Sequence, residues 1–300
     1  MNNTVTSAAA ASSPAADAPH GVGFEFVSEL AAALSAGPVE LPSFPDVALR
    51  VQELLADDSV STEMVVRIVG AEPMLAARVV SLANSAAMNP SSTPVADLRT
   101  AVARLGFDSL RAAAVSFAIG QLRRRDEYRA IEPQLNRLWI DSVNLAGSAC
   151  VVARRSRRTS ADTALFAGLV AGVGRIYILT RATAYPALFA DPVAYQSITE
   201  QWHANVARAL LESWHVVDEV VEAVHTYETP NHAQRGGSVL PDVLTVAAIL
   251  NAHRGLPDLP AAALHDLRAL TRLGLKVADC AELLVESATE MVSLRAALGR

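Results

Sequence analysis

The histidines of this chain have no spacing that is typical of a helical metal site. The chain contains seven of them: His20, His203, His215, His225, His232, His253 and His265. No two stand four residues apart, the spacing that turns two ring nitrogens toward one cation. Glu222 and His225 stand three apart, a geometry used in di-iron bundles, and we interpret them as a surface pair. We interpret His203, which follows Trp202, as a hydrogen-bonded interior histidine.

Motifs for nucleophilic hydrolysis and for phosphate binding are also missing from the sequence. No G-x-S-x-G elbow occurs, and we interpret Ser81, Ser85 and Ser142 as small residues in helix packing. The run at residues 168–174 reads GLVAGVG. It lacks the lysine and hydroxyl residue of a phosphate-binding loop, and no strand pattern precedes it.

Arginines are concentrated at two places. One is the run at 123–125, and the other comprises Arg154, Arg155, Arg157 and Arg158. Placed together, they would contact the phosphates of a nucleic acid. Arg154 and Arg155 have a simpler explanation, because cations stabilise the C-terminal end of a helix. The net charge of −6 gives no general tendency toward nucleic acid, so a nucleic-acid-binding regulator stays an alternative carried by this patch alone.

The rest of the sequence predicts the helices that would position these residues. Hydrophobic residues make up 51% of the 300 residues but aromatic ones only 5%, so Ala, Val and Leu must fill the core. No alternating strand pattern of useful length occurs, and we predict an all-α fold. A charged segment at 123–133 divides it into two lobes, residues 24–125 and residues 126–300. Residues 1–23 are rich in small residues and are expected to form a disordered tail.

Helix starts are indicated by four residues of the first lobe. Ser61 is a suitable N-cap, and Pro73 suits the first position of the following helix. Asp97 and Asp108 are expected to cap two further helices. These signals are local, because each requires only the residue itself and the amides of the next turn.

Two apolar patterns of the second lobe are predicted to lie in the core. One is a stripe of residues four apart: Trp202, Val206, Leu210 and Trp214. The other is GLVAGVGRIYIL at residues 168–179, in a helix expected from Ser160 to about residue 180. Its uncharged run, residues 163–174, is shorter than the roughly 20 residues that a membrane span needs. We therefore expect no membrane insertion.

The sequence favours a protein of the cytoplasm. The N-terminal 23 residues have neither the basic start nor the leucine-rich core of a signal peptide. The only cysteines, Cys150 and Cys280, are too far apart to indicate a disulfide framework or a metal-ligand motif, which fits a reducing compartment. We expect no cofactor, and the oligomeric state is left open.

Several segments in a fixed order resemble HDOD domains, bacterial output domains related to the HD hydrolases. The family's D-P-x-L…A-N-S helix appears as Glu72-Pro73-Met74-Leu75 followed by Leu82-Ala83-Asn84-Ser85. Its I-x-x-A-(I/V)-x-x-L-G turn appears at residues 98–106. The resemblance extends from about residue 41 to residue 251. It implies an all-helical fold and a regulatory role in bacterial signalling, in motility or second-messenger pathways, with a protein as partner.

The resemblance also identifies the positions where HD hydrolases hold their metal. Ala171 and Gly172 stand where relatives have the His-Asp pair, and neither side chain binds a metal. Asp141 stands at the position of the first histidine, and Ala248 at about the position of the last aspartate. One surviving carboxylate does not make a metal site, so the resemblance implies a protein without catalysis.

Two hypotheses remain beside each other. In the first, the chain is a non-catalytic module, with Asn84, Asp141, Arg175 and His203 as contact residues if the lobes meet in a cleft. In the second, it is a degenerate metal-dependent phosphohydrolase. Asp141 and His203 would then converge on a metal with Glu228, which stands where many relatives have a histidine.

Overall fold

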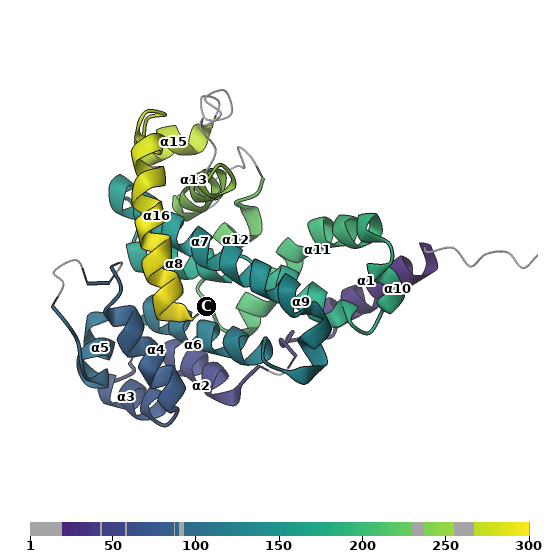
Figure 1. The fold of residues 1–300 in the computed structure, drawn as a ribbon, viewed down its shortest axis with the longest axis horizontal. Coiled ribbons are helices and arrows are strands. Elements are labelled where there is room, and N and C mark those ends of the chain that lie inside the picture. The colour runs from purple at the N-terminus through teal and green to yellow at the C-terminus, as the bar shows by residue number, and fades with distance from the viewer. Residues whose placement is uncertain are drawn as a thin grey trace, which may run out of the picture.

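The structure, a computed structural model, describes residues 20–42, 44–57, 59–86, 88–89, 93–229, 237–254 and 267–299. Every regular element in these ranges is a helix, which confirms the all-α prediction (Figure 1). Most of the predicted tail lies outside the described residues. Its last four residues belong to helix α1 (His20–Ser35), which therefore begins before the expected start at residue 24.

Five helices follow α1 along the first lobe: α2 (Asp46–Leu55), α3 (Thr62–Gly70), α4 (Pro73–Ala83), α5 (Leu98–Arg104) and α6 (Phe107–Leu122). Ser61 accepts a hydrogen bond from Met64 N (3.3 Å), and Pro73 is the first residue of α4, as predicted. Asp97 Oδ1 accepts from Thr100 N (2.8 Å), as predicted.

The expected cap at Asp108 is wrong, because α6 begins two residues earlier than predicted, at Phe107, and its N-cap residue is Gly106. The Asp108 carboxylate has other partners that compete for its oxygens. It pairs with Arg111 (2.9 Å) and accepts a hydrogen bond from the hydroxyl of Thr163 (2.7 Å). Asp108 thus ties α6 to the start of α8 instead of capping its own helix.

The second lobe is built from a 3₁₀ helix and nine α-helices in the described ranges: η1 (Asp126–Ile131), α7 (Glu132–Ser156), α8 (Ala161–Val170), α9 (Val173–Ala182), α10 (Pro186–Phe189), α11 (Pro192–Ser213), α12 (Asp218–Thr226), α13 (Leu240–Ala252), α15 (Arg268–Leu273) and α16 (Asp279–Leu298). The stripe on α11 lies in the core, as predicted: Val206, Leu210 and Trp214 are buried, and Trp202 packs against them at the edge.

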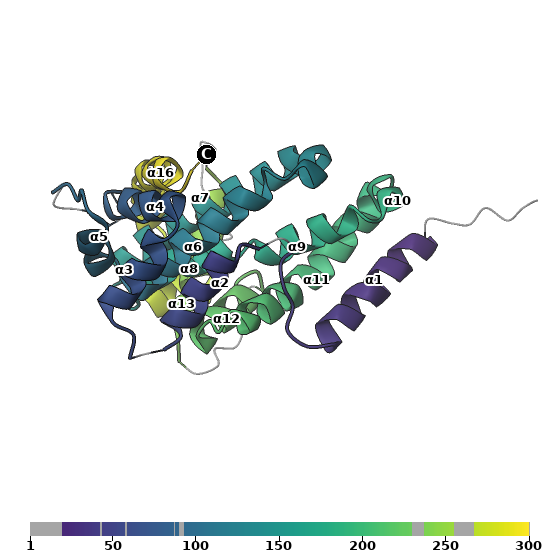
Figure 2. The same ribbon diagram turned by 90° about the horizontal axis from the view of Figure 1, so that it is seen from below.

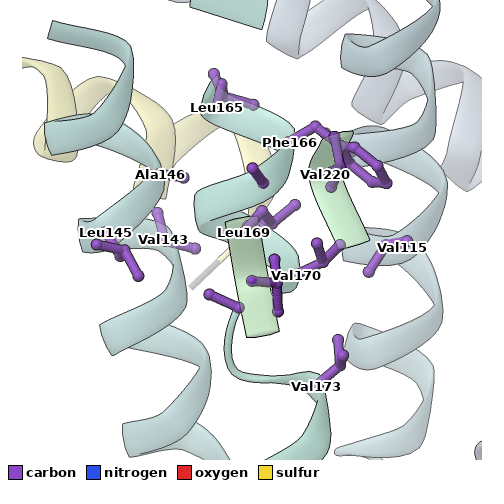
Figure 3. Packing of buried hydrophobic residues seen from close by; sticks show 14 of the residues in the cluster. Val115, Val143, Leu145, Ala146, Leu165, Phe166, Leu169, Val170, Val173 and Val220 are labelled. Atoms are coloured by element: carbon purple, nitrogen blue, oxygen red, sulfur yellow. The ribbon is translucent and has the colours of Figure 1, made fainter. Parts of the chain in front are cut away.

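Helix α8 lies at the centre of the hydrophobic core, in contact with α6, α7, α12 and α13. Figure 3 shows Phe166 of α8 beside Val220 of α12, with Val115 of α6 close by. A Cβ atom at Gly168 would lie 2.7 Å from the Cα atom of Ala146, so only glycine allows α8 to approach α7 this closely. The glycine-rich stretch of the sequence is therefore a packing motif.

The apolar segment Ala161–Ala182 is long and apolar enough to cross a membrane by length and composition alone. Within the fold, 83% of its most apolar window is buried. A turn at residues 171–172 divides the segment into α8 and α9, where the sequence had suggested one helix. This segment is the core of the domain.

The two lobes share one continuous core, because elements of each pack on the other. Helix α16, the yellow helix in Figure 1, packs along α7 and reaches α4 and α6, where Ser116 Oγ donates to the carbonyl of Leu298 (2.9 Å). Helix α1 had been assigned to the first lobe, but it packs on α10 and α11 of the second (Figure 2). Phe26 makes an edge-on ring contact with Tyr185 there, with centroids 5.3 Å apart.

Candidate functional site

A network of four side chains lies beside Gly172, one of the positions that the resemblance identified as metal-binding in HD hydrolases. Arg175 Nη2 donates to both carboxylate oxygens of Glu228, at 2.9 and 2.8 Å. His203 Nε2 lies 3.1 Å from Glu228 Oε2 and 3.1 Å from Arg175 Nη2. The hydroxyl of Tyr227 donates to Glu228 Oε1 (2.5 Å). Glu228 is therefore the common acceptor for groups from α9, α11 and the end of α12.

A close helix contact brings Arg175 to His203. Gly174 precedes Arg175 in the first turn of α9, and a Cβ atom there would lie 2.0 Å from the carbonyl oxygen of His203. The missing side chain lets α9 rest directly on the α11 backbone. His203 is 5% exposed and hydrogen-bonded, which confirms the interpretation of it as an interior histidine.

The electrostatics of the network favour an ionised Glu228. Burial raises the pKa of this carboxyl, but hydrogen bonds from His203 and Arg175 outweigh burial and hold the pKa well below its usual range. Burial and the neighbouring Glu228 raise the pKa of Tyr227, so the phenol stays protonated and donates a hydrogen bond to Glu228. The network is a closed set of donors around one carboxylate.

A cavity of about 410 Å³ opens beside this network. Its lining includes Asp141 of α7 together with Arg175, Tyr227 and Glu228. Burial raises the pKa of Asp141, against the lowering effect of several arginines, of which Arg254 acts most strongly. The structure therefore brings together three of the four predicted contact residues: Asp141 and Arg175 line the cavity, and His203 lies behind Arg175.

The residues at this place do not fit the metal that HD hydrolases hold. Ala171 is buried and Gly172 and Ala248 line the cavity, and none of the three has a side-chain donor. A Cβ atom at residue 172 would lie 2.4 Å from Ser142 Oγ, so a larger residue there requires Ser142 to move. No group of three potential ligands exists among the described residues. The guanidinium of Arg175, itself a cation, is bonded to the remaining glutamate and lies 3.1 Å from the ring nitrogen of the remaining histidine.

Asn84, the fourth predicted contact residue, is the C-cap residue of α4. Its Nδ2 donates to the carbonyls of Val80 (3.0 Å) and Val95 (2.7 Å), and its Oδ1 accepts from Val95 N (2.8 Å). It does not line the cavity with the other three, and its role as a contact residue stays a prediction. Asn84 fastens the chain before α5 to α4.

Two of the four arginines of the basic patch at residues 154–158 are paired within the fold. Arg154 and Arg155 lie in the last turn of α7, as the helix-end explanation predicts. Arg154 forms an ion pair with Glu290 of α16 (2.9 Å), and Arg155 pairs with two further glutamates of that helix. Arg157 ends α7 in the left-handed conformation (φ 54°), and its side chain and that of Arg158 are exposed.

Glu222 and His225 of α12 are both bonded to Arg208 of α11, at 3.0 Å each. The local sequence could not indicate these contacts, because Arg208 lies on another helix. Ser85 and Ser142 are buried, as expected of packing residues. Ser81 is exposed, so that interpretation of it is wrong. Both cysteines are buried free thiols.

Comparison with solved structures shows the same fold in several bacterial proteins. A candidate metal-dependent phosphohydrolase from Shewanella amazonensis SB2B is 24% identical, with a TM-score of 0.69 over 91% of this chain and 99% of that one. An HDOD domain protein of unknown function from Geobacter sulfurreducens is 22% identical, with a TM-score of 0.62 over 93% and 96%. A candidate signal transduction protein from Marinobacter aquaeolei VT8 is 22% identical, with a TM-score of 0.59 over 93% and 68%.

These similarities concern the fold, because all three identities are low. No curated protein matches the sequence. The model of the HDOD domain matches residues 41–230, well over half of the chain and the part that contains Ala171, Gly172, Arg175, His203 and Glu228. With the motifs, the helical fold and this match in agreement, the chain belongs to the HDOD domain family.

Proposed function

We propose that this protein is a non-catalytic regulatory module of bacterial signal transduction that acts by binding another macromolecule, in the first place a protein. One observation carries the proposal: the Arg175 guanidinium is bonded to Glu228 and lies 3.1 Å from His203 Nε2 where an HD hydrolase would hold its metal. The neighbour named as a candidate signal transduction protein agrees with such a role.

Charge and hydrogen bonding explain why this arrangement disfavours hydrolysis. A catalytic cation needs several fixed nitrogen and oxygen ligands to lower the pKa of its bound water. Here Arg175 contributes a fixed positive charge, it donates to both carboxylate oxygens of Glu228, and it lies 3.1 Å from His203 Nε2. A divalent cation at this place would have to displace the Arg175 side chain, and the positive charge of the guanidinium would repel it.

A partner-binding role also requires exposed apolar side chains. Val285 and Val292 of α16 are 71% and 67% exposed and stand two helical turns apart, which places them on one face. Ile140 of α7 is 40% exposed and lines a cavity together with Val292. We assign the protein contact to this face of α7 and α16. The cytoplasmic location remains part of the proposal.

The alternative of a degenerate phosphohydrolase is favoured by one observation. His203, Glu228 and Asp141 do converge on one region, although they are far apart in sequence. Nucleic-acid binding has less support, since Arg154 and Arg155 are paired with α16.

The experiment is elemental mass spectrometry of the untagged protein after gel filtration, with hydrolysis of bis(p-nitrophenyl) phosphate assayed in the presence of Mn²⁺. We expect far less than one transition metal per chain and no hydrolysis above the buffer rate. About one metal per chain, lost in both Asp141→Ala and His203→Ala, would overturn the proposal in favour of the phosphohydrolase.

A further inference from the structure

Two cavities adjoin at Arg175 and Leu138, which line both of them. The first is the cavity of about 410 Å³ beside Glu228, and the second has a volume of about 340 Å³. Each lies in the range of roughly 300–1,000 Å³ that is typical of small-molecule sites. The wall of the second cavity is mainly apolar and includes Leu179, Phe189 and Tyr195. The ring centroids of Phe189 and Tyr195 lie 5.5 Å apart.

Positive charge exceeds negative charge around the first cavity. Four arginines act electrostatically on Asp141: Arg137, Arg175, Arg254 and Arg295. Glu228, the other carboxylate of this cavity, is bonded to Arg175. In the described part of the chain, no carboxylate forms an ion pair with Arg137, Arg254 or Arg295.

The positive groups are costly to hold together in this way. Burial and the neighbouring Arg254 both lower the pKa of Arg295, which shows that the two guanidinium groups disfavour each other. Asp141 and Glu228 are two carboxylates among these four cations, and Glu228 is already paired with Arg175. A bound anion would relieve the repulsion and form charge-assisted hydrogen bonds with the guanidinium groups.

A second, independent feature points to a ligand. Asn251 Oδ1, which belongs to a residue lining the first cavity, is buried and has no hydrogen-bond partner among the described residues. A buried polar atom without a partner costs free energy, so a ligand hydroxyl or amine that donates to it would be stabilised.

We infer that the two cavities form one site for a small amphiphilic organic anion. Its oxyanion, a phosphate or a carboxylate, lies against Arg254 and Arg175, and its apolar or aromatic part lies in the second cavity. Such a ligand would join three helices: α7, which carries Arg137, α9, which carries Arg175, and α13, which ends just before Arg254. The inference goes beyond the proposed function, because it adds a small-molecule effector to a module that binds a macromolecule.

The test is isothermal titration of the full chain with phenyl phosphate, benzoate and inorganic phosphate. We expect saturable binding of phenyl phosphate or benzoate, and the stronger of the two identifies the oxyanion. Inorganic phosphate should bind at least about tenfold more weakly than phenyl phosphate, because it leaves the apolar cavity unfilled.

Variants of single residues localise the binding. Arg254→Gln removes an exposed cation and should weaken binding about tenfold, the usual size of one charge-assisted contact. Arg50→Gln, an exposed arginine on α2, is the matched control and should bind like the wild type. Phe189→Ala should weaken binding of phenyl phosphate and leave that of inorganic phosphate unchanged.

Three results would overturn the inference: no saturable binding of either aromatic anion, equal affinity in the wild type and Arg254→Gln, or binding of inorganic phosphate as tight as that of the stronger aromatic anion. Release of phenol in the same samples would contradict the proposed function instead, because the site would then hydrolyse what it binds. The two proposals can therefore fail separately.

Discussion

Arg175 Nη2 lies within 2.9 Å of both carboxylate oxygens of Glu228, although 53 residues separate the two in sequence. The contact joins the start of α9 to the end of α12, on either side of α11. One guanidinium nitrogen thus connects three helices through Glu228 and His203. An ion pair therefore holds these helices together beside Gly172.

Arg175→Gln should lower the free energy of unfolding by about 1–2 kcal/mol, because it leaves Glu228 partly buried without its cation. The estimate is below that for a fully buried pair, since the side chains are 25% and 40% exposed and water screens them. Urea denaturation measures the change. Arg99→Gln, from an exposed pair with Glu63, serves as control and should leave the stability nearly unchanged. Equal losses in both variants would show that the network does not stabilise the fold.

The stability contributed by Glu228 should decrease in acid. Its pKa in the folded protein lies below the ordinary value of 4.5, so the unfolded chain binds a proton first as the pH falls. The contribution is complete above that ordinary value and is lost progressively as the pH falls below it. Unfolding free energies at pH 7 to 3 test this, with Glu228→Gln as reference. The difference between wild type and variant should be constant from pH 7 to about 6 and shrink below about pH 5. A difference that grows in acid would contradict the direction of the shift.

Local signals in the sequence predicted local structure well. Ser61, Pro73 and Asp97 start their helices as expected, because a cap depends on its own side chain and the next turn. Asp108 failed for a tertiary reason, since the competing donor Thr163 comes from α8. The same holds for the packing of α1 on α11, which no local pattern of the chain encodes.

The candidate site was only half predictable. The resemblance identified Ala171 and Gly172 as residues without metal-binding side chains. The contact of Arg175 with Glu228 could not be predicted, because it depends on how closely α9 and α11 pack. Arg254 gave no signal at all, since it follows α13 without any motif.

Gly174→Ala should be strongly destabilising. The new Cβ atom would lie 2.0 Å from the carbonyl oxygen of His203 and 2.9 Å from the nitrogen of Ala207, both backbone atoms that cannot rotate away. Helix α9 would have to move off α11, at a cost of about 3 kcal/mol or more. Gly21→Ala is the matched control on an exposed helical glycine with open space around it, and should be neutral or stabilising by up to about 1 kcal/mol. Thermal and urea unfolding measure the stability of both variants. A Gly174→Ala protein as stable as Gly21→Ala would disprove the close contact.

Asn84→Ala should act on the fold and leave the amphiphilic-anion site intact. The variant removes two hydrogen bonds that hold the chain at Val95 to the end of α4 and a third to Val80 of α4 itself, so we expect a loss of about 1–3 kcal/mol. The amide of Val95, which donates to Asn84 Oδ1, should exchange with solvent much faster, and hydrogen exchange detected by NMR resolves that single site. Ser81→Ala, an exposed change on the same helix, should alter stability by less than about 0.5 kcal/mol. If Val95 stayed protected while binding of phenyl phosphate weakened, Asn84 would belong to the binding surface after all, as the sequence first suggested.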